Sequence, residues 1–187
     1  MIPANVEIHG SVFSLVAPPE NTPELLEQAR LFYSDPINMT FLPFFCFEWT
    51  EQQVIERRNM QKDLHLNHKA LNFDMISREN NQLIGVCGFR MVDLEKSEAE
   101  FGIILHHTYW GKGIAKEAHK LFINYVFEKL NLQFVYALTS PENLPMRKFF
   151  EKFQIPFLGE QSIITGATWC KYGIKKDEWE TLKKNFD

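Results

Sequence analysis

The chain has 187 residues and a mass of 22.0 kDa, which suits one compact domain better than two small ones. Apolar residues make up 45% and charged residues 24%, as is usual for a globular protein. The net charge of −4 lacks the basic surplus typical of nucleic-acid-binding proteins, so we expect no nucleic-acid partner.

Export and membrane insertion are not expected either. The first residues, MIPANVEIHG, have neither a basic start nor an apolar signal core, and no apolar run approaches the length of a membrane span. Three cysteines, Cys46, Cys87 and Cys170, match no metal-binding spacing, and His106 and His107 are merely neighbours on an expected loop. We therefore expect no bound metal and a reducing, cytoplasmic compartment.

The first third of the chain predicts one strand followed by two helices. Val6 to Val16 has the pattern of a strand. Thr22 caps a helix that has proline at its first position and ends near Ser34-Asp35-Pro36. Thr50 caps a second helix, from about Glu51 to Asn67.

The connection between these helices is unusually aromatic. It runs Phe41-Leu42-Pro43-Phe44-Phe45-Cys46-Phe47. Packing in a core or a lid explains it without any further role, and a part in shaping an acceptor pocket is the alternative.

Strands follow in the middle of the chain. Ala70 to Ser77 and Leu83 to Val92 are expected to form a hairpin across Glu79-Asn80-Asn81-Gln82. A central strand from Ser97 to Leu105 ends in the apolar run Phe101-Gly102-Ile103-Ile104-Leu105.

A glycine turn, Trp110-Gly111-Lys112-Gly113-Ile114-Ala115, links this strand to a long amphipathic helix that runs to Leu130. Glycine lets a ligand approach the backbone closely, and the first turn of a helix has unpaired N–H groups and a partial positive charge. Such a turn can hold a phosphate or pyrophosphate. The plainer interpretation is a tight connection without a ligand.

Two well-known phosphate-binding loops do not fit. The nucleotide-triphosphate loop needs G-x-x-x-x-G-K-[ST], which the chain lacks. The dinucleotide fingerprint needs a third glycine and an acidic residue about 20 residues further on. Lys116 stands in place of that glycine, and Thr139 and Ser140 close the next strand without an acid.

The last quarter predicts a strand, a helix, two more strands and a terminal helix. The strand is Phe134 to Thr139, and Pro141-Glu142-Asn143 leads into the helix at Met146 to Phe153. Strands are expected near Pro156–Ile163 and Thr168–Ile174, before a charged helix over 176–184. We find no repeat or linker, so residues 1–187 are expected to form a single domain.

The central motif resembles the acetyl-CoA-binding motif of the GNAT N-acetyltransferases, and particularly their RimJ/RimL-like branch. That branch shows a strand like "aEiGywl" followed by "hpeywGkGyatEA", and Ala99 to Ala118 follows this pattern almost position by position. Gly113 and Ala115 satisfy the superfamily signature [Q/R]-x-x-G-x-[G/A], with Trp110 in place of its first residue. The resemblance covers nearly the whole chain and is strongest from Leu83 to Phe153.

The resemblance implies an α+β fold, with a central, mostly antiparallel, splayed seven-stranded sheet flanked by helices. It implies an N-acetyltransferase that moves an acetyl group from acetyl-CoA, as co-substrate, to a primary amine by direct attack in a ternary complex. The amine is a protein N-terminus or a small molecule. Neither nucleic acid nor membrane is implied as a partner, and the family is compatible with a homodimer.

The same resemblance implies the coenzyme site. The backbone of Ile103, Ile104 and Leu105 is expected to pair with the pantetheine arm like an added strand. Asn143 is expected to meet the coenzyme near that arm. The pyrophosphate is expected at the turn and first helical residues, namely Trp110, Gly111, Lys112, Gly113, Ile114, Ala115 and Lys116.

Glu100 matches the strand carboxylate of this branch and is the expected base, which accepts the amine proton through water. Its alternative is an ordinary strand residue. Glu98 lies two residues earlier on the same face and is the substitute candidate.

The proton donor departs from the family pattern. Met146 stands where many members of the branch have serine, and Phe150 stands where many other GNAT enzymes have tyrosine. Neither side chain can donate a proton. Water, Tyr172 or Ser140 takes this role, or thiolate departure needs little help, or the protein binds a CoA thioester with little or no transfer.

Three hypotheses follow: an acetyl-CoA-dependent N-acetyltransferase, a non-catalytic acyl-CoA-binding or sensing module, and a structural domain that uses the glycine turn only for folding. The long match disfavours the third. Coenzyme affinity separates it from the other two, and thiol release in the presence of amines separates the first from the second.

Overall fold

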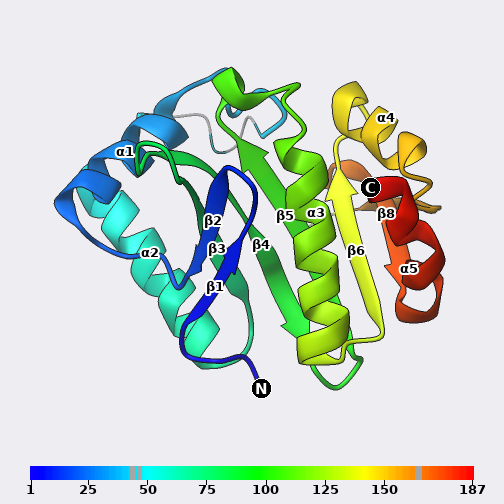
Figure 1. The fold of residues 1–187 in the computed structure, drawn as a ribbon. Coiled ribbons are helices and arrows are strands. Elements are labelled where there is room, and N and C mark those ends of the chain that lie inside the picture. Colours follow the sequence, from blue (N-terminus) through cyan, green and yellow to red (C-terminus); the bar gives the residue numbers. More distant parts are fainter. Residues whose placement is uncertain (43–44, 46–47, 163–165) are drawn as a thin grey trace.

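The computed structural model describes residues 1–42, 45, 48–162 and 166–187. Eight strands form one sheet in the order β1-β2-β3-β4-β5-β6-β8-β7 (Figure 1). Every neighbouring pair is antiparallel except β5 and β6. The strands are β1 (Val6–His9), β2 (Phe13–Ala17), β3 (Leu71–Ser77), β4 (Leu83–Asp93), β5 (Glu98–Leu105), β6 (Phe134–Thr139), β7 (Phe157–Ser162) and β8 (Thr168–Lys175).

The expected α+β class and the mostly antiparallel sheet are confirmed, but the expected number of seven strands is wrong. The stretch Val6 to Val16, which was expected to be one strand, is the hairpin of β1 and β2. Gly10 donates its N–H to the carbonyl of Phe13 at 2.8 Å, and the strands then pair from Val6 with Ala17 onward. A reversal at Gly10-Ser11-Val12 therefore divides the expected strand into two.

The helices start where their capping residues predict. Thr22 Oγ1 accepts the N–H of Leu25 at 3.3 Å, and Thr50 forms a reciprocal capping box with Gln53. The helices are α1 (Pro23–Ser34), α2 (Glu51–Leu66), α3 (Ile114–Tyr125), α4 (Leu144–Lys152) and α5 (Lys176–Leu182). Short 3-10 turns lie at His107–Tyr109 and Lys183–Phe186, and the expected long helix continues beyond α3 as a π-helical turn over Val126–Leu130.

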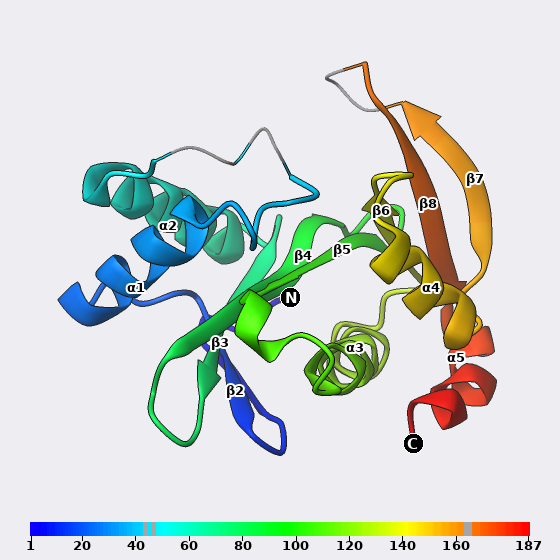
Figure 2. The same cartoon turned by 90° about the horizontal axis from the view of Figure 1, so that it is seen from above.

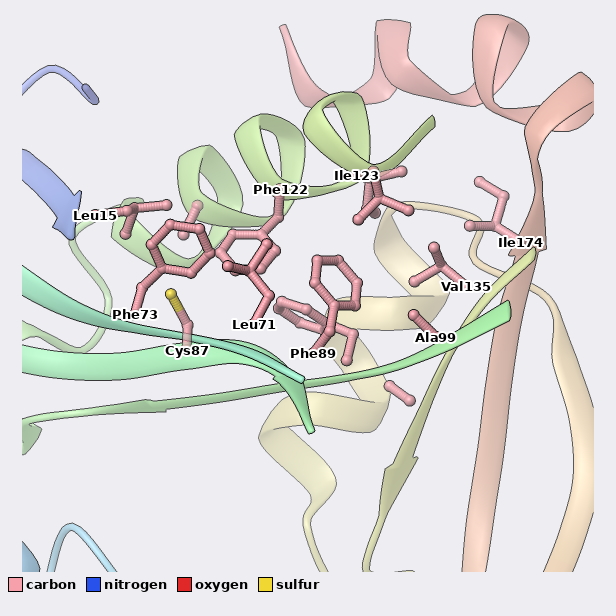
Figure 3. Close-up of a cluster of buried hydrophobic side chains, with 14 of the residues drawn as sticks. Leu15, Leu71, Phe73, Cys87, Phe89, Ala99, Phe122, Ile123, Val135 and Ile174 are labelled. Atoms are coloured by element: carbon pink, nitrogen blue, oxygen red, sulfur yellow. The ribbon is translucent and has the colours of Figure 1, made fainter. Parts of the chain in front are cut away.

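Helices cover both faces of the sheet. α1 and α2 lie on one face, while α3 and α5 lie on the other (Figure 2). Under α3 the strands contribute a continuous apolar layer, part of which Figure 3 shows. The ring of Phe122 on α3 lies 5.1 Å from that of Phe73, 5.0 Å from that of Phe89 and 5.3 Å from that of Phe101. This aromatic packing fixes α3 against the centre of the sheet.

The α1/α2 face contains a smaller apolar cluster and a buried ion pair. Leu26, Phe32 and Trp49 belong to the cluster. Beside it, Arg58 Nη2 lies 2.9 Å from Asp74 Oδ2, with both side chains almost fully buried. Burial raises the pKa of Asp74 to about 6, although the Arg58 guanidinium opposes the shift.

The aromatic connection between α1 and α2 is described only in part. Pro43, Phe44, Cys46 and Phe47 lie outside the described residues, so its expected role as core, lid or pocket stays open there. Its described part packs inward: the Phe45 ring stacks on Trp49 at 6.4 Å between centroids. The described helices include none that is long and apolar enough to cross a membrane.

Candidate functional site

The expected coenzyme site lies where β5 and β6 part. Their parallel pairing covers only Glu98 to Phe101 of β5, opposite Phe134 to Ala137 of β6. β5 remains paired with β4 as far as Leu105, which lies opposite Gly85. Among the described strands, the second half of β5 therefore has a neighbour on one side alone. Its other edge is free to pair with an extended ligand.

The free edge offers the backbone of two residues in particular. His106 donates its N–H to the carbonyl of Ile84 on β4 at 2.9 Å. Because backbone direction alternates along an antiparallel strand, the polar groups of Ile104 also point to β4, while those of Ile103 and Leu105 point away from it. Ile104 instead places its side chain in the apolar cluster of the α1/α2 face.

The glycine turn ends in a left-handed residue at the start of α3. Gly111 and Gly113 have φ angles of 72° and 79°, a region that strongly favours glycine. Gly113 is the N-cap of α3 and supplies no side-chain cap. A Cβ atom built on Gly113 would have no heavy atom within 4 Å, so the space beside the helix start is open. The first-turn amides of Ile114 to Lys116 are thus accessible to an anion.

Side chains around the turn support it in different ways. Trp110 donates its indole N–H to the carbonyl of Leu105 at 2.9 Å, which ties the turn to the end of β5. The Lys112 ammonium lies 5.0 Å from the Tyr109 ring centroid. Lys116 instead donates to the backbone oxygen of Asp187, so its side chain points to the end of the chain.

Asn143 stands at the start of α4 as its cap. Its Oδ1 accepts the N–H of Met146 at 3.2 Å. Met146 is half-buried against the main core, and Phe150 is buried and stacks on Tyr172 at 4.6 Å between centroids. The two residues that replace the family's proton donors are therefore packing residues.

The alternative donors are also engaged. Tyr172 is buried, and its hydrogen bond to Arg147 raises the pKa of that guanidinium. Ser140 accepts the N–H of Glu142 through Oγ at 3.2 Å. Both oxygens accept a hydrogen bond in these contacts, so each hydroxyl keeps a proton that it can donate.

Glu100 lies on the α1/α2 face of β5, because its neighbours Ala99 and Phe101 pack on the opposite face. Its side chain is 12% exposed, and Oε1 lies 3.5 Å from Arg90 Nη1. The carboxylate is thus nearly enclosed, one residue before the pairing between β5 and β6 ends.

Tyr136 is a residue of this site that sequence reasoning missed. It pairs with Glu100 across β5 and β6 and lies on the same face, with Lys171 Nζ 4.1 Å from its ring centroid. Burial and the nearby carboxylates of Glu100 and Glu98 raise the pKa of Tyr136 to about 12. The phenol keeps its proton at neutral pH, and its raised pKa makes it a weaker acid than an ordinary tyrosine. Only the strand register brings Tyr136 to Glu100.

His119, on the inner side of α3, is a buried ionisable residue of the core that sequence reasoning did not single out. It is 2% exposed, and its Nδ1 donates to the carbonyl of Ala115 at 2.7 Å. The rings of Phe101 and Phe149 enclose it at 4.4 and 4.5 Å, and its Nε2 has no hydrogen-bond partner among the described residues. Burial lowers the pKa of His119 to about 4, so the imidazole is neutral at physiological pH.

Comparison with known proteins identifies the family. A family model described as "Acetyltransferase (GNAT) domain" matches residues 15–154. An "Uncharacterized N-acetyltransferase p20" of Bacillus licheniformis is 38% identical over 117 residues, which cover 63% of this chain and 65% of that protein. The match thus spans slightly less than two thirds of this relative's length.

Solved structures share the fold. The chain matches a GCN5-related N-acetyltransferase from Brucella melitensis with a TM-score of 0.82 and 20% identity, over 100% of this chain and 86% of the other. It matches a spermidine N-acetyltransferase from Vibrio cholerae, solved in complex with CoA and spermine, with a TM-score of 0.73 and 19% identity, over 91% and 99% of the two chains.

Proposed function

Since the chain belongs to the acetyltransferase (GNAT) domain family, we propose that it is an N-acetyltransferase that moves an acetyl group from acetyl-CoA to a primary amine. The acceptor is a protein N-terminal amine or a small amine, and the protein belongs to the RimJ/RimL-like branch. The observation that carries the proposal is the unpaired edge of β5 at Ile103 and Leu105, which a short 3-10 turn connects to the start of α3 at Gly113, where no side chain caps the helix.

The residues of this edge fit the coenzyme. Acetyl-CoA supplies an activated acetyl thioester, a long arm with two amide groups and a pyrophosphate. The N–H and C=O groups of Ile103 and the N–H of Leu105 would pair with the amides of the arm, while the Leu105 carbonyl already accepts the Trp110 indole N–H. The amides of Ile114 to Lys116 would bind the pyrophosphate, with the open space beside Gly113 giving it room. Asn143 remains a proposed contact through its side-chain amide.

Glu100 is the proposed base. The amine nitrogen must lose a proton as it attacks the thioester carbon, and the C–S bond then breaks to release the thiolate. A nearly enclosed carboxylate at the point where β5 and β6 part is placed to accept that proton through a water molecule. Glu98 is the substitute candidate.

Tyr136 joins Ser140, Tyr172 and water as a candidate donor to the departing thiolate. Its phenol keeps a proton at neutral pH, lies on the same face as Glu100 and is paired with it in register. Tyr172 accepts a hydrogen bond from Arg147 through its oxygen and keeps its own O–H, so it stays a candidate. Thiolate departure with no donor is the remaining route.

A second function is favoured by a specific observation. Met146 and Phe150 pack in the core in place of the family's proton donors, which is what a non-catalytic acyl-CoA-binding or sensing module would tolerate.

In either case we propose a homodimer, a cytoplasmic setting and partners that include neither nucleic acid nor membrane. The buried free thiols of Cys87 and Cys170 support a reducing compartment, and light scattering tests the dimer.

The two functions are separated by measuring CoA thiol release from acetyl-CoA against a panel of amines. The panel contains spermidine, short peptides with free N-termini and simple alkylamines. Release above the amine-free background supports the transferase. Saturable acetyl-CoA binding with no release for any amine supports the sensing module, and absence of binding contradicts both.

A further inference from the structure

Three potential metal ligands meet beside the proposed coenzyme site. Asp35 is the C-cap of α1, while His106 and His107 directly follow β5. One donor atom from each side chain lies within 4.8 Å of the other two, and His107 Nδ1 is 3.1 Å from Asp35 Oδ2. The fold thus brings together ligands from two distant parts of the chain.

Neighbouring groups hold this cluster in place. Asn38 is buried, and its side-chain amide donates to the carbonyl of Phe32 at 3.1 Å, which directs its Oδ1 toward His107. That oxygen accepts the backbone N–H of His107 at 2.8 Å and lies 3.3 Å from its Nδ1. The polar groups around His107 are therefore oriented before any ion binds.

His106 is held by Thr108. Its Nδ1 accepts the backbone N–H of Thr108 at 3.3 Å and lies 2.9 Å from Thr108 Oγ1, and its ring stacks on that of His107 with 4.6 Å between centroids. Nδ1 is therefore the unprotonated nitrogen of the neutral ring. Nε2 becomes a ligand atom when the ring proton moves from Nε2 to Nδ1 and is donated to Thr108 Oγ1, the kind of hydrogen bond by which a protein orients a metal-binding histidine.

We propose that Asp35, His106 and His107 form a binding site for a zinc ion. Two imidazoles and one carboxylate are a ligand set that zinc favours, with water completing the coordination. Ligand atoms around tetrahedral zinc lie about 3.3 Å apart, given bonds of about 2.0 to 2.2 Å. The donor atoms of the cluster lie within 4.8 Å of one another, so binding one zinc ion requires them to approach by up to about 1.5 Å.

Zinc at this position would join two distant segments of the chain, the end of α1 and the end of β5, beside the proposed coenzyme site. Asp35 ends α1 and begins the segment that leads into the aromatic connection, whereas His106 and His107 begin the turn that leads to Gly113. The ion would hold the α1 side of the molecule against the coenzyme turn. It needs no chemical part in acetyl transfer, so its binding can be tested apart from the proposed function.

The simpler interpretation is an Asp35–His107 hydrogen bond that has no use for an ion. A close analogue exists on the surface, where His9 Nδ1 lies 3.7 Å from Glu7 Oε1. His9 provides a matched control, because it is a histidine beside a carboxylate that lacks the second histidine and the supporting Asn38 side chain of the cluster.

The experiment is a calorimetric titration of tag-free, chelator-treated full-length chain with zinc chloride. Wild type is compared with Asp35→Asn, His106→Gln and the control His9→Gln, and magnesium chloride serves as the control ion. We expect one zinc per chain with a Kd in the micromolar range or below, at least 10-fold weaker binding in the two cluster variants, unchanged binding in His9→Gln, and no magnesium binding.

The proposal is overturned when wild type shows no saturable zinc binding, or when its binding survives both cluster substitutions. Circular dichroism shows whether each variant is folded. If Asp35→Asn does not fold, the zinc affinity of His106→Gln decides the test. A zinc-dependent rise in the Tm of wild type, absent from the folded cluster variant, provides the second readout. Neither readout depends on acetyl transfer, so failure here leaves the proposed function untouched.

Discussion

The two faces of the sheet are built from different chemistry. On the α3 face, the strands contribute apolar side chains, such as Phe73 from β3, Ala99 from β5 and Val135 from β6 (Figure 3). On the α1/α2 face, the intervening positions of these strands hold Asp74, Glu100 and Tyr136. The same strands thus present an apolar surface to one layer of helices and ionisable groups to the other.

This difference assigns the two faces different roles: the α3 face stabilises the fold, and we propose that the α1/α2 face contributes to substrate recognition. An apolar layer is stable without partners, whereas each buried charge must be paired or lose its charge. The α1/α2 face meets this need with the Arg58–Asp74 pair deep in the sheet and with the Arg90–Glu100 contact nearer to the parting of β5 and β6. We interpret the first pair as structural, whereas the second contains Glu100, the proposed base.

The largest expected effect comes from breaking the buried pair on the α1/α2 face. Arg58→Met leaves Asp74 without its counter-charge, and we expect a loss of about 3 to 5 kcal/mol in the free energy of unfolding. Urea unfolding monitored by circular dichroism measures it. Arg30→Met, which removes the partly exposed pair with Glu27, is the control and should cost about 1 kcal/mol or less.

The double variant Arg58→Met/Asp74→Leu should regain most of the loss, because both charges are then gone. Equal losses for the Arg58 and Arg30 variants would contradict the structural role of the buried pair.

The α3 face has its own ionisable group, His119, and this predicts a pH dependence. The pKa of His119 is lowered to about 4 in the folded chain, from an ordinary value near 6.5. Between these values the unfolded chain binds the proton and the folded chain does not, so stability falls as pH drops from about 6.5 to about 4. The contribution reaches about 3 kcal/mol at the acidic end.

His119→Leu should lose this dependence. The difference in unfolding free energy between wild type and the variant, measured by urea titration from pH 7.5 to 4.5, should change in favour of the variant as pH falls. Taking the difference cancels the opposite slope of Asp74, whose pKa is raised to about 6. The exposed His9→Gln variant serves as the control. If the unfolding free energies of His119→Leu and wild type changed in parallel with pH, His119 would not be a buried neutral imidazole.

Next in size is the effect on catalysis of the nearly enclosed carboxylate. Glu100→Gln should lower kcat about 100-fold with an accepted amine, because the proton acceptor is lost, while the acetyl-CoA Kd is retained. Glu98→Gln, on the same strand face, is the matched control and should keep near-normal turnover. The reverse pattern would move the role of base to Glu98.

The smallest effect is expected at the coenzyme turn. Trp110→Phe removes the indole N–H that donates to the carbonyl of Leu105, while it keeps an aromatic ring. We expect acetyl-CoA to bind about 2- to 5-fold more weakly, which corresponds to a hydrogen bond worth about 0.5 to 1 kcal/mol. Calorimetry checks it, and unchanged affinity would show that the turn does not depend on this bond.

Sequence reasoning reached most of the fold because its signals are local. Caps at Thr22 and Thr50, apolar alternation in the strands and the glycines before α3 act within a few residues. The β1–β2 hairpin was missed although Gly10-Ser11 is a pair that favours hairpin turns, because the residues on both sides of it were interpreted as one strand. The pairing of β1 with β2 shows the turn.

The candidate site was predicted in part for the same reason. Gly113 and Glu100 lie in one continuous motif, whereas Tyr136 reaches Glu100 only through the parallel register of β5 and β6. Asp35 likewise meets His107 through tertiary structure. Contacts between segments distant in sequence depend on how the sheet assembles, which no local pattern records.

The most direct test of the coenzyme site is a calorimetric titration of acetyl-CoA into wild type, Gly113→Trp and Gly166→Trp. The two glycines have φ angles of 79° and 80°, and a Cβ on either would have no heavy atom within 4 Å, so the substitutions impose similar local strain. Only Gly113 stands at the start of α3. We expect saturable binding by wild type and Gly166→Trp and at least 100-fold weaker binding by Gly113→Trp. Equal binding by all three proteins, or none by folded wild type, would contradict a coenzyme site at this turn.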